Sequence, residues 1–274
     1  MQAIEAFCID NHLGILQQVP QEKAGGLTHI VFEIQTDRGH YALKILDDFV
    51  MTKPEALAQT LQGEAVAHSF AVQGIPAVCA IQVRGKLIQQ LETGEFVLLY
   101  PWVPGQQKYY PDFGLTEVRH IARTLAKLHT AAPPQPSDKV VSHRDFDPKN
   151  VLWDGEEFRI IDWEAAGEID PMEELIALAF EWSGFELGEV DQTLFNAFFK
   201  SYTEAGAVIK QNHLVLGLQG FIHNYEEWYA FNKVRLHSAQ TQSEKIRLET
   251  QLALTRKKLF FLKDEGFKFV DLQK

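Results

Sequence analysis

Three polar residues in the run SHRDFDPKNVLWDGEEFRIIDWE, residues 142–164, have types and a spacing that suit phosphate chemistry. They are Asp145, Asn150 and Asp162. Two carboxylates and one amide supply oxygen ligands of the kind that a hard cation such as Mg²⁺ takes. The pattern His-x-Asp-x-x-x-x-Asn, followed by an aspartate at the end of a strand, is the phosphotransfer signature of kinase-type folds. The sequence therefore predicts a site for a magnesium-bound nucleotide.

The elements that must position these residues can be predicted from the same run. Two short apolar stretches flank Asp154-Gly155, a pair that tolerates positive φ and is typical of a hairpin turn. An antiparallel hairpin brings the start of its first strand beside the end of its second strand. We therefore expect Asn150 and Asp162 to lie side by side, with Asp145 on the preceding loop facing them.

Composition excludes several classes of protein. The chain has 274 residues, 46% of them hydrophobic, and a net charge of −11, which disfavours nucleic-acid binding because that needs a basic face. No apolar run is long enough to span a bilayer, and the N-terminus does not resemble a secretory signal. Cys8 and Cys79 are the only cysteines, so we expect no disulfide framework and a cytoplasmic location.

Acidic residues are concentrated between residues 151 and 191, where Arg159 is the only basic residue. Two interpretations are open. The acids can form ordinary solvated faces and loops, or they can form a negative rim that concentrates a cationic substrate.

The first hundred residues predict short strands and one helix. Residues 29–35 and 40–46 read as a hairpin, and Lys44 stands in the apolar second strand, where a buried lysine needs a carboxylate or a phosphate. Residues 53–73 have helical periodicity. Glu64 in this helix is either the partner of Lys44 or a surface acid. Further strands are expected at residues 76–83, 86–90 and 96–100.

Helices dominate the rest of the chain. The run from Pro101 to Gly105 breaks the last strand and is the best boundary. We predict an α+β fold with a β-rich lobe (1–100), a hinge (101–105) and a mostly helical lobe (106–274). The helices are expected at residues 116–130, 172–183, 192–205, 213–233 and 243–263.

With these residues in place, the chain resembles the aminoglycoside phosphotransferase family of the protein-kinase-like superfamily, whose relatives include choline and ethanolamine kinases. The resemblance implies a bilobal fold with a small antiparallel sheet and one helix in the N-terminal lobe. It implies that Asp145 is the catalytic base or the residue that orients the acceptor hydroxyl, and that Asn150 and Asp162 hold Mg²⁺. It also implies that Lys44 binds the α- and β-phosphates while Glu64 fixes the geometry of Lys44.

Further roles follow from the same resemblance. Residues 25–29, with Gly26 and Thr28, would cover the phosphates. The Pro101 carbonyl and the Val103 N–H would bind the nucleobase of ATP. Tyr100 would lie at the back of the pocket, and because a bulky residue there can favour guanine, GTP is an alternative phosphate donor. His143 is expected to hydrogen-bond the loop backbone. Arg144 and Asp147 depart from the family pattern, and their roles are open.

The acceptor is expected to be a small molecule, because the short stretch from Asp162 to Met172 leaves no room for a peptide-docking segment. By resemblance, Glu226, Trp228 and Asn232 line its site. Three hypotheses stay open: a kinase for aminoglycosides or similar polycations, a metabolic kinase for choline, ethanolamine, thiamine or a sugar, and a silent nucleotide-binding protein. We expect a monomer.

Overall fold

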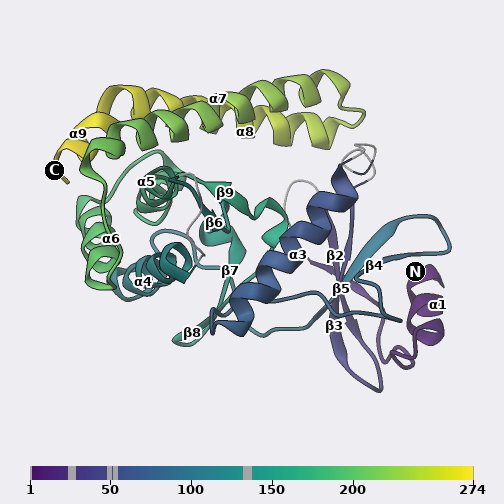
Figure 1. The fold of residues 1–274 in the computed structure, drawn as a ribbon. Helices are drawn as coiled ribbons and strands as arrows, with labels where there is room; N and C mark the ends of the chain where they lie inside the picture. Colours follow the sequence, from purple (N-terminus) through teal and green to yellow (C-terminus); the bar gives the residue numbers. More distant parts are fainter. Residues whose placement is uncertain (1, 24–28, 48–50, 52–54, 132–137, 274) are drawn as a thin grey trace. The chain divides into compact units, whose positions relative to one another are not determined.

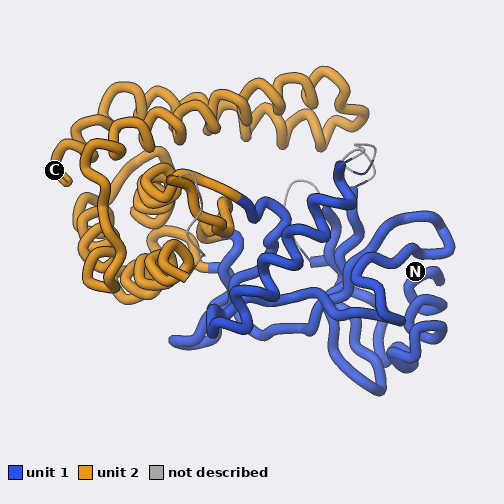
Figure 2. Tube along the Cα trace, viewed as in Figure 1, with its two compact units in different colours: residues 1–107, 149–167 blue, residues 108–148, 168–274 orange. Residues whose placement is uncertain are grey.

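The structure is a computed structural model that describes residues 2–23, 29–47, 51, 55–131 and 138–273 (Figure 1). It divides into two compact units (Figure 2). Unit 1 comprises Met1–Gln107 and Lys149–Gly167, and unit 2 comprises Lys108–Pro148 and Glu168–Lys274. The predicted division into residues 1–100, 101–105 and 106–274 stays a prediction. The fold is mixed α+β, as the sequence predicts. None of the described helices has both the length and the apolar character needed to cross a bilayer.

Unit 1 is built on a five-stranded antiparallel sheet in the order β1-β2-β3-β5-β4. The predicted hairpin of β2 and β3 is confirmed, with Ile30 opposite Ile45 and Gln35 opposite His40. Side chains alternate across the sheet, so Ile34 and Leu43 enter the core and are 0% exposed. The strands are β1 (Gln21–Lys23), β2 (Ile30–Gln35), β3 (His40–Ile45), β4 (Ile88–Gln90) and β5 (Phe96–Pro101).

Two of the helices that the structure describes, α1 and α3, accompany this sheet. Helix α1 (Gln2–Asp10) packs Ile4, Phe7 and Cys8 into the core that contains the sheet residues. Helix α3 (Ala56–Val72) lies within the predicted helix 53–73. It packs against the 3₁₀ turn η2 (Trp163–Ala165) so closely that a Cβ on Gly63 would lie 2.5 Å from the Trp163 carbonyl oxygen. The helix therefore contacts the chain directly after Asp162.

The predicted strand at residues 76–83 is wrong. The Val78 N–H donates to Ile160, in the hairpin around Asp154-Gly155, at 2.9 Å, whereas the Ile81 N–H donates to Leu99 of β5 at 2.6 Å. Since the segment divides its backbone hydrogen bonds between two elements, it forms no continuous ladder with either. Of this region, only β4 joins the sheet.

The predicted hairpin around Asp154-Gly155 is confirmed. Strand β7 (Val151–Asp154) pairs antiparallel with β8 (Glu157–Ile160), and Asp154 faces Glu157 across the turn. Gly155 has a φ of 62°, as the turn requires. The short helix η1 (Pro148–Asn150) precedes the hairpin.

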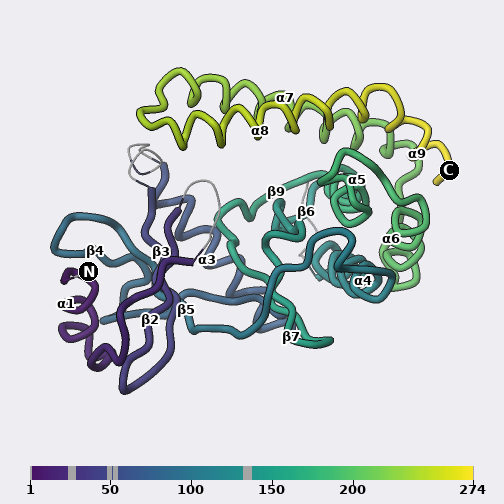
Figure 3. Tube along the Cα trace, turned by 180° about the vertical axis from the view of Figure 1, so that it is seen from behind, coloured from purple at the N-terminus to yellow at the C-terminus, as the bar shows by residue number. Residues whose placement is uncertain are grey.

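Unit 2 is mainly helical. Helix α4 packs on α6, and α5 packs on α7, around aromatic contacts such as Phe180 with Phe195, whose ring centroids are 4.8 Å apart. Helices α7 and α8 run side by side (Figures 1 and 3). The short strands β6 (Val140–Ser142) and β9 (Gly167–Ile169) pair with each other. The remaining elements are α4 (Leu115–Ala131), α5 (Pro171–Glu181), η3 (Phe185–Leu187), α6 (Gln192–Glu204), η4 (Gln211–His213), α7 (Leu214–Ser238), α8 (Gln242–Phe261), the π-helical turn η5 (Leu262–Gly266) and α9 (Phe267–Asp271).

Candidate active site

Lys44 is a buried cation in the middle of the sheet. It lies opposite Val31 of β2 and Leu98 of β5 and is 7% exposed. Its ammonium group donates to Asp162 Oδ1 at 2.6 Å and to Glu164 Oε2 at 2.8 Å. Burial alone would lower the pKa of Lys44, but the charges of the two carboxylates raise it above its ordinary value. Lys44 is therefore charged at any physiological pH and held by two acids.

Glu64 lies on the buried face of α3 and is 6% exposed. Its two oxygens accept hydrogen bonds from the Tyr100 hydroxyl and the Ala80 N–H, each at 2.7 Å. Among the described residues Glu64 makes no ion pair with Lys44, so the structure differs here from the predicted partnership. The reason is that two neutral donors already occupy the Glu64 carboxylate, while Lys44 binds the acids after β8. Burial raises the pKa of Glu64 above its ordinary value, although these hydrogen bonds and the charge of Lys44 oppose the rise.

Glu164 is shared between Lys44 and His29. The His29 Nε2 lies 2.8 Å from Glu164 Oε2, and its Nδ1 accepts from the Asp47 N–H at 2.8 Å. Because Nδ1 accepts, the proton of the neutral ring is on Nε2 and is donated to Glu164. Burial by itself would raise the pKa of Glu164, yet the His29 hydrogen bond and the charge of Lys44 lower it to about 2. The predicted phosphate-covering residues just before His29, Gly26 and Thr28, lie outside the described residues.

Asn150 and Asp162 stand at the open end of the hairpin. The Ile161 N–H donates to the Asn150 carbonyl at 3.0 Å, so Asn150 lies beside the residue that precedes Asp162. Asp162 itself has a φ of 63°, in the left-handed region that residues other than glycine rarely adopt. This backbone turn lies between β8 and η2, and Asp162 contacts Lys44 from it.

The oxygen donors at this end of the hairpin fit Mg²⁺. This ion is usually bound through one or two carboxylates, while phosphates of the substrate and water complete its octahedron. Asp162 uses one of its two carboxylate oxygens for Lys44. The described residues contain no group of three or more His, Cys, Asp or Glu arranged for a metal. A magnesium ion here would therefore depend on Asn150, Asp162 and the phosphates of the nucleotide.

The segment predicted to bind the nucleobase is attached to the hairpin. Pro101 is the last residue of β5, and Val103 is half-buried, with an N–H that donates to none of the described residues. Gln106 then forms two backbone hydrogen bonds with Trp153 of β7, both at 2.9 Å. Gly105, with a φ of 126°, passes so close that a Cβ would lie 2.8 Å from the Trp153 carbonyl oxygen. Only glycine fits this crossing.

Asp145 belongs to unit 2, in the loop after β6. His143 in this loop is 0% exposed, and its Nδ1 accepts from the Asp145 N–H at 3.2 Å. The predicted hydrogen bond between His143 and the loop backbone is thus confirmed. Arg144 has a φ of 67°, and its N–H donates to Glu174 Oε1 at 2.8 Å. The catalytic position of Asp145 stays a prediction.

A buried polar network supports this loop from α4, α5 and α6. Glu174 is 2% exposed, and its Oε2 lies 2.8 Å from His129 Nε2. The other ring nitrogen of His129 lies 2.8 Å from the Tyr202 hydroxyl. Burial by itself would raise the pKa of Glu174, but the hydrogen bond and the charge of His129 lower it. Glu174 is therefore ionised, and its second oxygen fixes the Arg144 backbone.

The predicted acceptor residues lie on α7 and already have intramolecular contacts. Glu226 pairs with Lys263 at 2.5 Å, and the Trp228 ring stacks on Phe231 with centroids 5.7 Å apart. Asn232 is 0% exposed and donates to the Trp228 carbonyl at 2.9 Å. Their roles in acceptor binding stay predictions.

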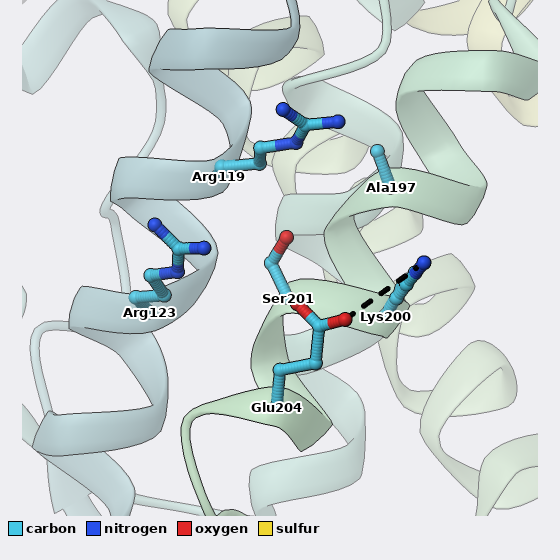
Figure 4. Close-up of a pocket in the computed structure, with 6 residues that line it drawn as sticks. All are labelled: Arg119, Arg123, Ala197, Lys200, Ser201 and Glu204. Carbon is cyan, nitrogen blue, oxygen red and sulfur yellow. Dashed lines mark ion pairs between the residues drawn. The ribbon is translucent and has the colours of Figure 1, made fainter.

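A pocket of about 180 Å³ lies elsewhere in unit 2, between α4 and α6 (Figure 4). Arg119 and Arg123 face it from α4, and Lys200 on α6 pairs with Glu204 at 3.8 Å. None of the predicted site residues lines this pocket.

Comparisons with known proteins give a family model for part of the chain and a shared fold for nearly all of it. A model of the "Phosphotransferase enzyme family" matches residues 130–208, which include Asp145, Asn150 and Asp162. The fold is that of a spectinomycin phosphotransferase solved with ADP and spectinomycin (TM-score 0.68, 14% identity, 99% of this chain and 97% of that chain covered). The resemblance to the aminoglycoside phosphotransferase family is confirmed.

Two further solved structures share this kinase-like fold. One is an amicoumacin kinase in complex with AMP-PNP, Ca²⁺ and its substrate (TM-score 0.68, 12% identity, 93% of this chain and 92% of that chain). The other is a microcompartment-associated aminopropanol kinase (TM-score 0.66, 10% identity, 98% and 99%). A search of curated protein sequences gives no match.

Several residues around the candidate site were not predicted from the sequence. One of them is Glu164, the last residue of the run 142–164. Its position two residues after Asp162 was the sequence signal that could have identified it. Glu174 and His129 gave no local signal, because they meet only through the packing of α4 against α5.

Proposed function

We propose that this chain is a small-molecule kinase that transfers the γ-phosphate of a nucleoside triphosphate to a hydroxyl group. The observation that carries the proposal is the buried Lys44, held by Asp162 and Glu164 beside a hairpin whose open end carries Asn150. A buried, permanently charged amine next to oxygen ligands is the arrangement that phosphoryl transfer needs, since the reaction depends on positioning and charge neutralisation.

Each residue then has a task. Lys44 contacts the α- and β-phosphates, and Glu164 with His29 keeps its ammonium group in place. Asn150 and Asp162 hold Mg²⁺, which supplies neutralisation of the phosphate charge when bound. The Pro101 carbonyl and the Val103 N–H bind the nucleobase. We propose ATP as the phosphate donor, with GTP as the alternative.

Asp145 acts on the acceptor. Its carboxylate orients the hydroxyl group and takes the proton as the new oxygen–phosphorus bond forms. The bond between the γ-phosphorus and the bridging oxygen breaks, and a nucleoside diphosphate leaves. The His143 and Glu174 hydrogen bonds to the loop backbone keep Asp145 in one conformation for this step.

Two acceptor classes are proposed. The first is an aminoglycoside or a similar polycation, supported by the acidic stretch between residues 151 and 191 and by the structural likeness to the spectinomycin phosphotransferase. The second is a small metabolic alcohol such as choline, ethanolamine, thiamine or a sugar, supported by the likeness to the aminopropanol kinase.

A coupled assay of nucleoside diphosphate release tests the proposal. ATP and GTP are each supplied with Mg²⁺ and with aminoglycosides, choline, ethanolamine, aminopropanol, thiamine and sugars in turn. We expect acceptor-dependent release with one chemical class. Nucleotide binding without release for any acceptor would instead favour the silent nucleotide-binding protein.

A further inference from the structure

A buried lysine of α8 has no task in the proposed chemistry. Lys258 is 8% exposed, and its Nζ lies 3.0 Å from the Tyr225 hydroxyl and 3.3 Å from Glu181 Oε2. The same Nζ stands over two aromatic rings, 5.0 Å from the Phe185 centroid and 5.4 Å from the Tyr225 centroid. The Tyr225 hydroxyl also donates to Glu181. We call Glu181, Phe185 and Tyr225 the lysine box.

The lysine box is joined to the catalytic loop within unit 2. Trp182 follows Glu181 directly, and its indole N–H donates to the Phe146 carbonyl at 2.9 Å. Phe146 stands between Asp145 and Asp147 in the sequence. Burial and the charge of Glu181 raise the pKa of Tyr225 well above its ordinary value, and the charges of Asp147 and Asp145 add to the rise. The box therefore adjoins the loop that carries Asp145.

The chemistry of the box is that of a cation-binding site. Aromatic faces attract an ammonium group, most strongly when it is desolvated, and a carboxylate neutralises its charge. In this chain the bound ammonium is the side chain of Lys258. Removing it from Glu181 would leave a half-buried carboxylate without its counter-ion, which is costly. A competing cation would therefore have to displace a well-held group.

We propose that Lys258 is a specificity-determining residue that fills the cation subsite beside the catalytic loop and excludes acceptors whose ammonium group would bind there. This inference rests on the proposed kinase function for its consequence. Quaternary ammonium alcohols are excluded from this subsite, and accepted substrates bind their hydroxyl group at Asp145 without placing a cation between Glu181 and Tyr225. The remaining acceptors are hydroxyl compounds that are uncharged, or whose positive charge does not enter the lysine box.

The test is cation binding by the full chain, without nucleotide. In Lys258→Ala the box is open, and tetramethylammonium chloride should raise Tm by about 3 °C at ten times its dissociation constant, relative to sodium chloride at equal ionic strength. The wild-type chain should show no such rise. Adding Glu181→Gln to Lys258→Ala should abolish the rise, because the carboxylate is then lost.

Lys263→Ala is the matched control, since it also removes a lysine that pairs with a glutamate, here Glu226, but it leaves no aromatic enclosure. It should gain no tetramethylammonium binding. If Lys258→Ala does not fold alone, butylammonium, which reproduces the lysine side chain, should restore folding. The proposal is overturned if the wild type responds like Lys258→Ala, if the folded variant shows no rise, or if butylammonium fails to restore an unfolded one.

The readout separates the two proposals. Cation binding can be measured without turnover. If no acceptor gave diphosphate release, the kinase function would be wrong, but the measured binding of tetramethylammonium in the lysine box would still stand. Conversely, if the chain were an active kinase but Lys258→Ala bound no cation, the kinase function would stand. The proposed role of Lys258 in acceptor specificity would then be wrong.

Discussion

Lys44 and the two acids that hold it depend on one another. The ammonium group is buried, and such a charge is stable only while Asp162 and Glu164 compensate it. Glu164 has a second donor in His29. Lys44 would therefore keep Glu164 as a partner if Asp162 turned toward a metal ion.

The pH dependence of stability should report this arrangement. The pKa of Glu164 is lowered from 4.5 to about 2, so between these values the unfolded chain binds more protons than the folded chain. The stabilisation by Glu164 is complete above about pH 4.5 and is lost as the pH falls toward 2. We expect the difference in unfolding free energy between the wild type and Glu164→Gln to shrink between pH 5 and pH 3.

Urea unfolding at several pH values measures this difference. Glu156→Gln is the matched control, because Glu156 is exposed on the hairpin turn. A constant difference for Glu164→Gln over this range would show that Glu164 is not held as an anion.

Asp145→Asn tests the catalytic assignment at the residue scale. An amide cannot take the proton of the acceptor, so kcat should fall about 10²- to 10⁴-fold. The affinity for magnesium nucleotide should stay within about twofold, since Asp145 has no proposed contact with it. Asp154→Asn, an exposed change on the hairpin turn, is expected to keep full turnover. Unimpaired turnover in Asp145→Asn would remove the assignment.

Among the elements, the contact of α3 with η2 positions the residues after β8. Gly63 allows the helix to lie against the Trp163 carbonyl, and Phe70 of the same helix packs on the Trp163 ring with centroids 5.8 Å apart. Any displacement of this helix would therefore move η2, which is bounded by Asp162 and contains Glu164.

Gly63→Ala is predicted to destabilise the protein. Alanine favours a helix over glycine by about 1 kcal/mol, but its Cβ would lie 2.5 Å from a backbone oxygen. Overpacking of this kind costs about 1–3 kcal/mol and should outweigh the helix preference. Chemical denaturation measures the change, with Gln62→Ala on the exposed face expected within about 0.5 kcal/mol of wild type. A stabilised Gly63→Ala would mean that α3 does not press on η2.

For the whole molecule, the net charge of −11 makes salt a test of the acceptor class. A negative surface attracts cations over a distance that salt shortens, to about 10 Å at 0.1 M and about 3 Å at 1 M. If the acceptor is a polycation, its KM should rise several-fold between 0.05 and 0.5 M salt. A neutral acceptor should show little change. Salt can also weaken nucleotide binding. Steady-state kinetics in which the nucleotide and the acceptor are both varied separates that change from the rise in the KM of the acceptor.

Local patterns predicted the elements better than the contacts between them. The hairpin around Asp154-Gly155, the strand that carries Lys44 and the helix that carries Glu64 followed from turn residues and periodicity. The partner of Lys44 did not, because the choice between Glu64 and the acids after β8 depends on distances across the packed unit. The left-handed φ of Asp162 was equally hidden, since aspartate has no sequence signal that requires this conformation.

The same limit explains the wrong strand at residues 76–83. Its residues have strand-like composition, but their N–H groups bind two different elements. His129 and Glu174 are far apart in sequence and meet through the packing of α4 with α5. Periodicity identifies the buried side of each helix without showing which polar groups will face each other there.

The crossing of Gly105 over Trp153 also restricts how this chain can vary. Between the end of β5 at Pro101 and the backbone bridge at Gln106, the number of residues is fixed by two anchored ends. An added residue would have to bulge outward or break the bridge. A segment shortened by one residue would not reach from Pro101 to Gln106. Homologous chains that keep the bridge should therefore show neither insertions nor deletions here, and any side chain in place of the glycine should come with a rebuilt linker.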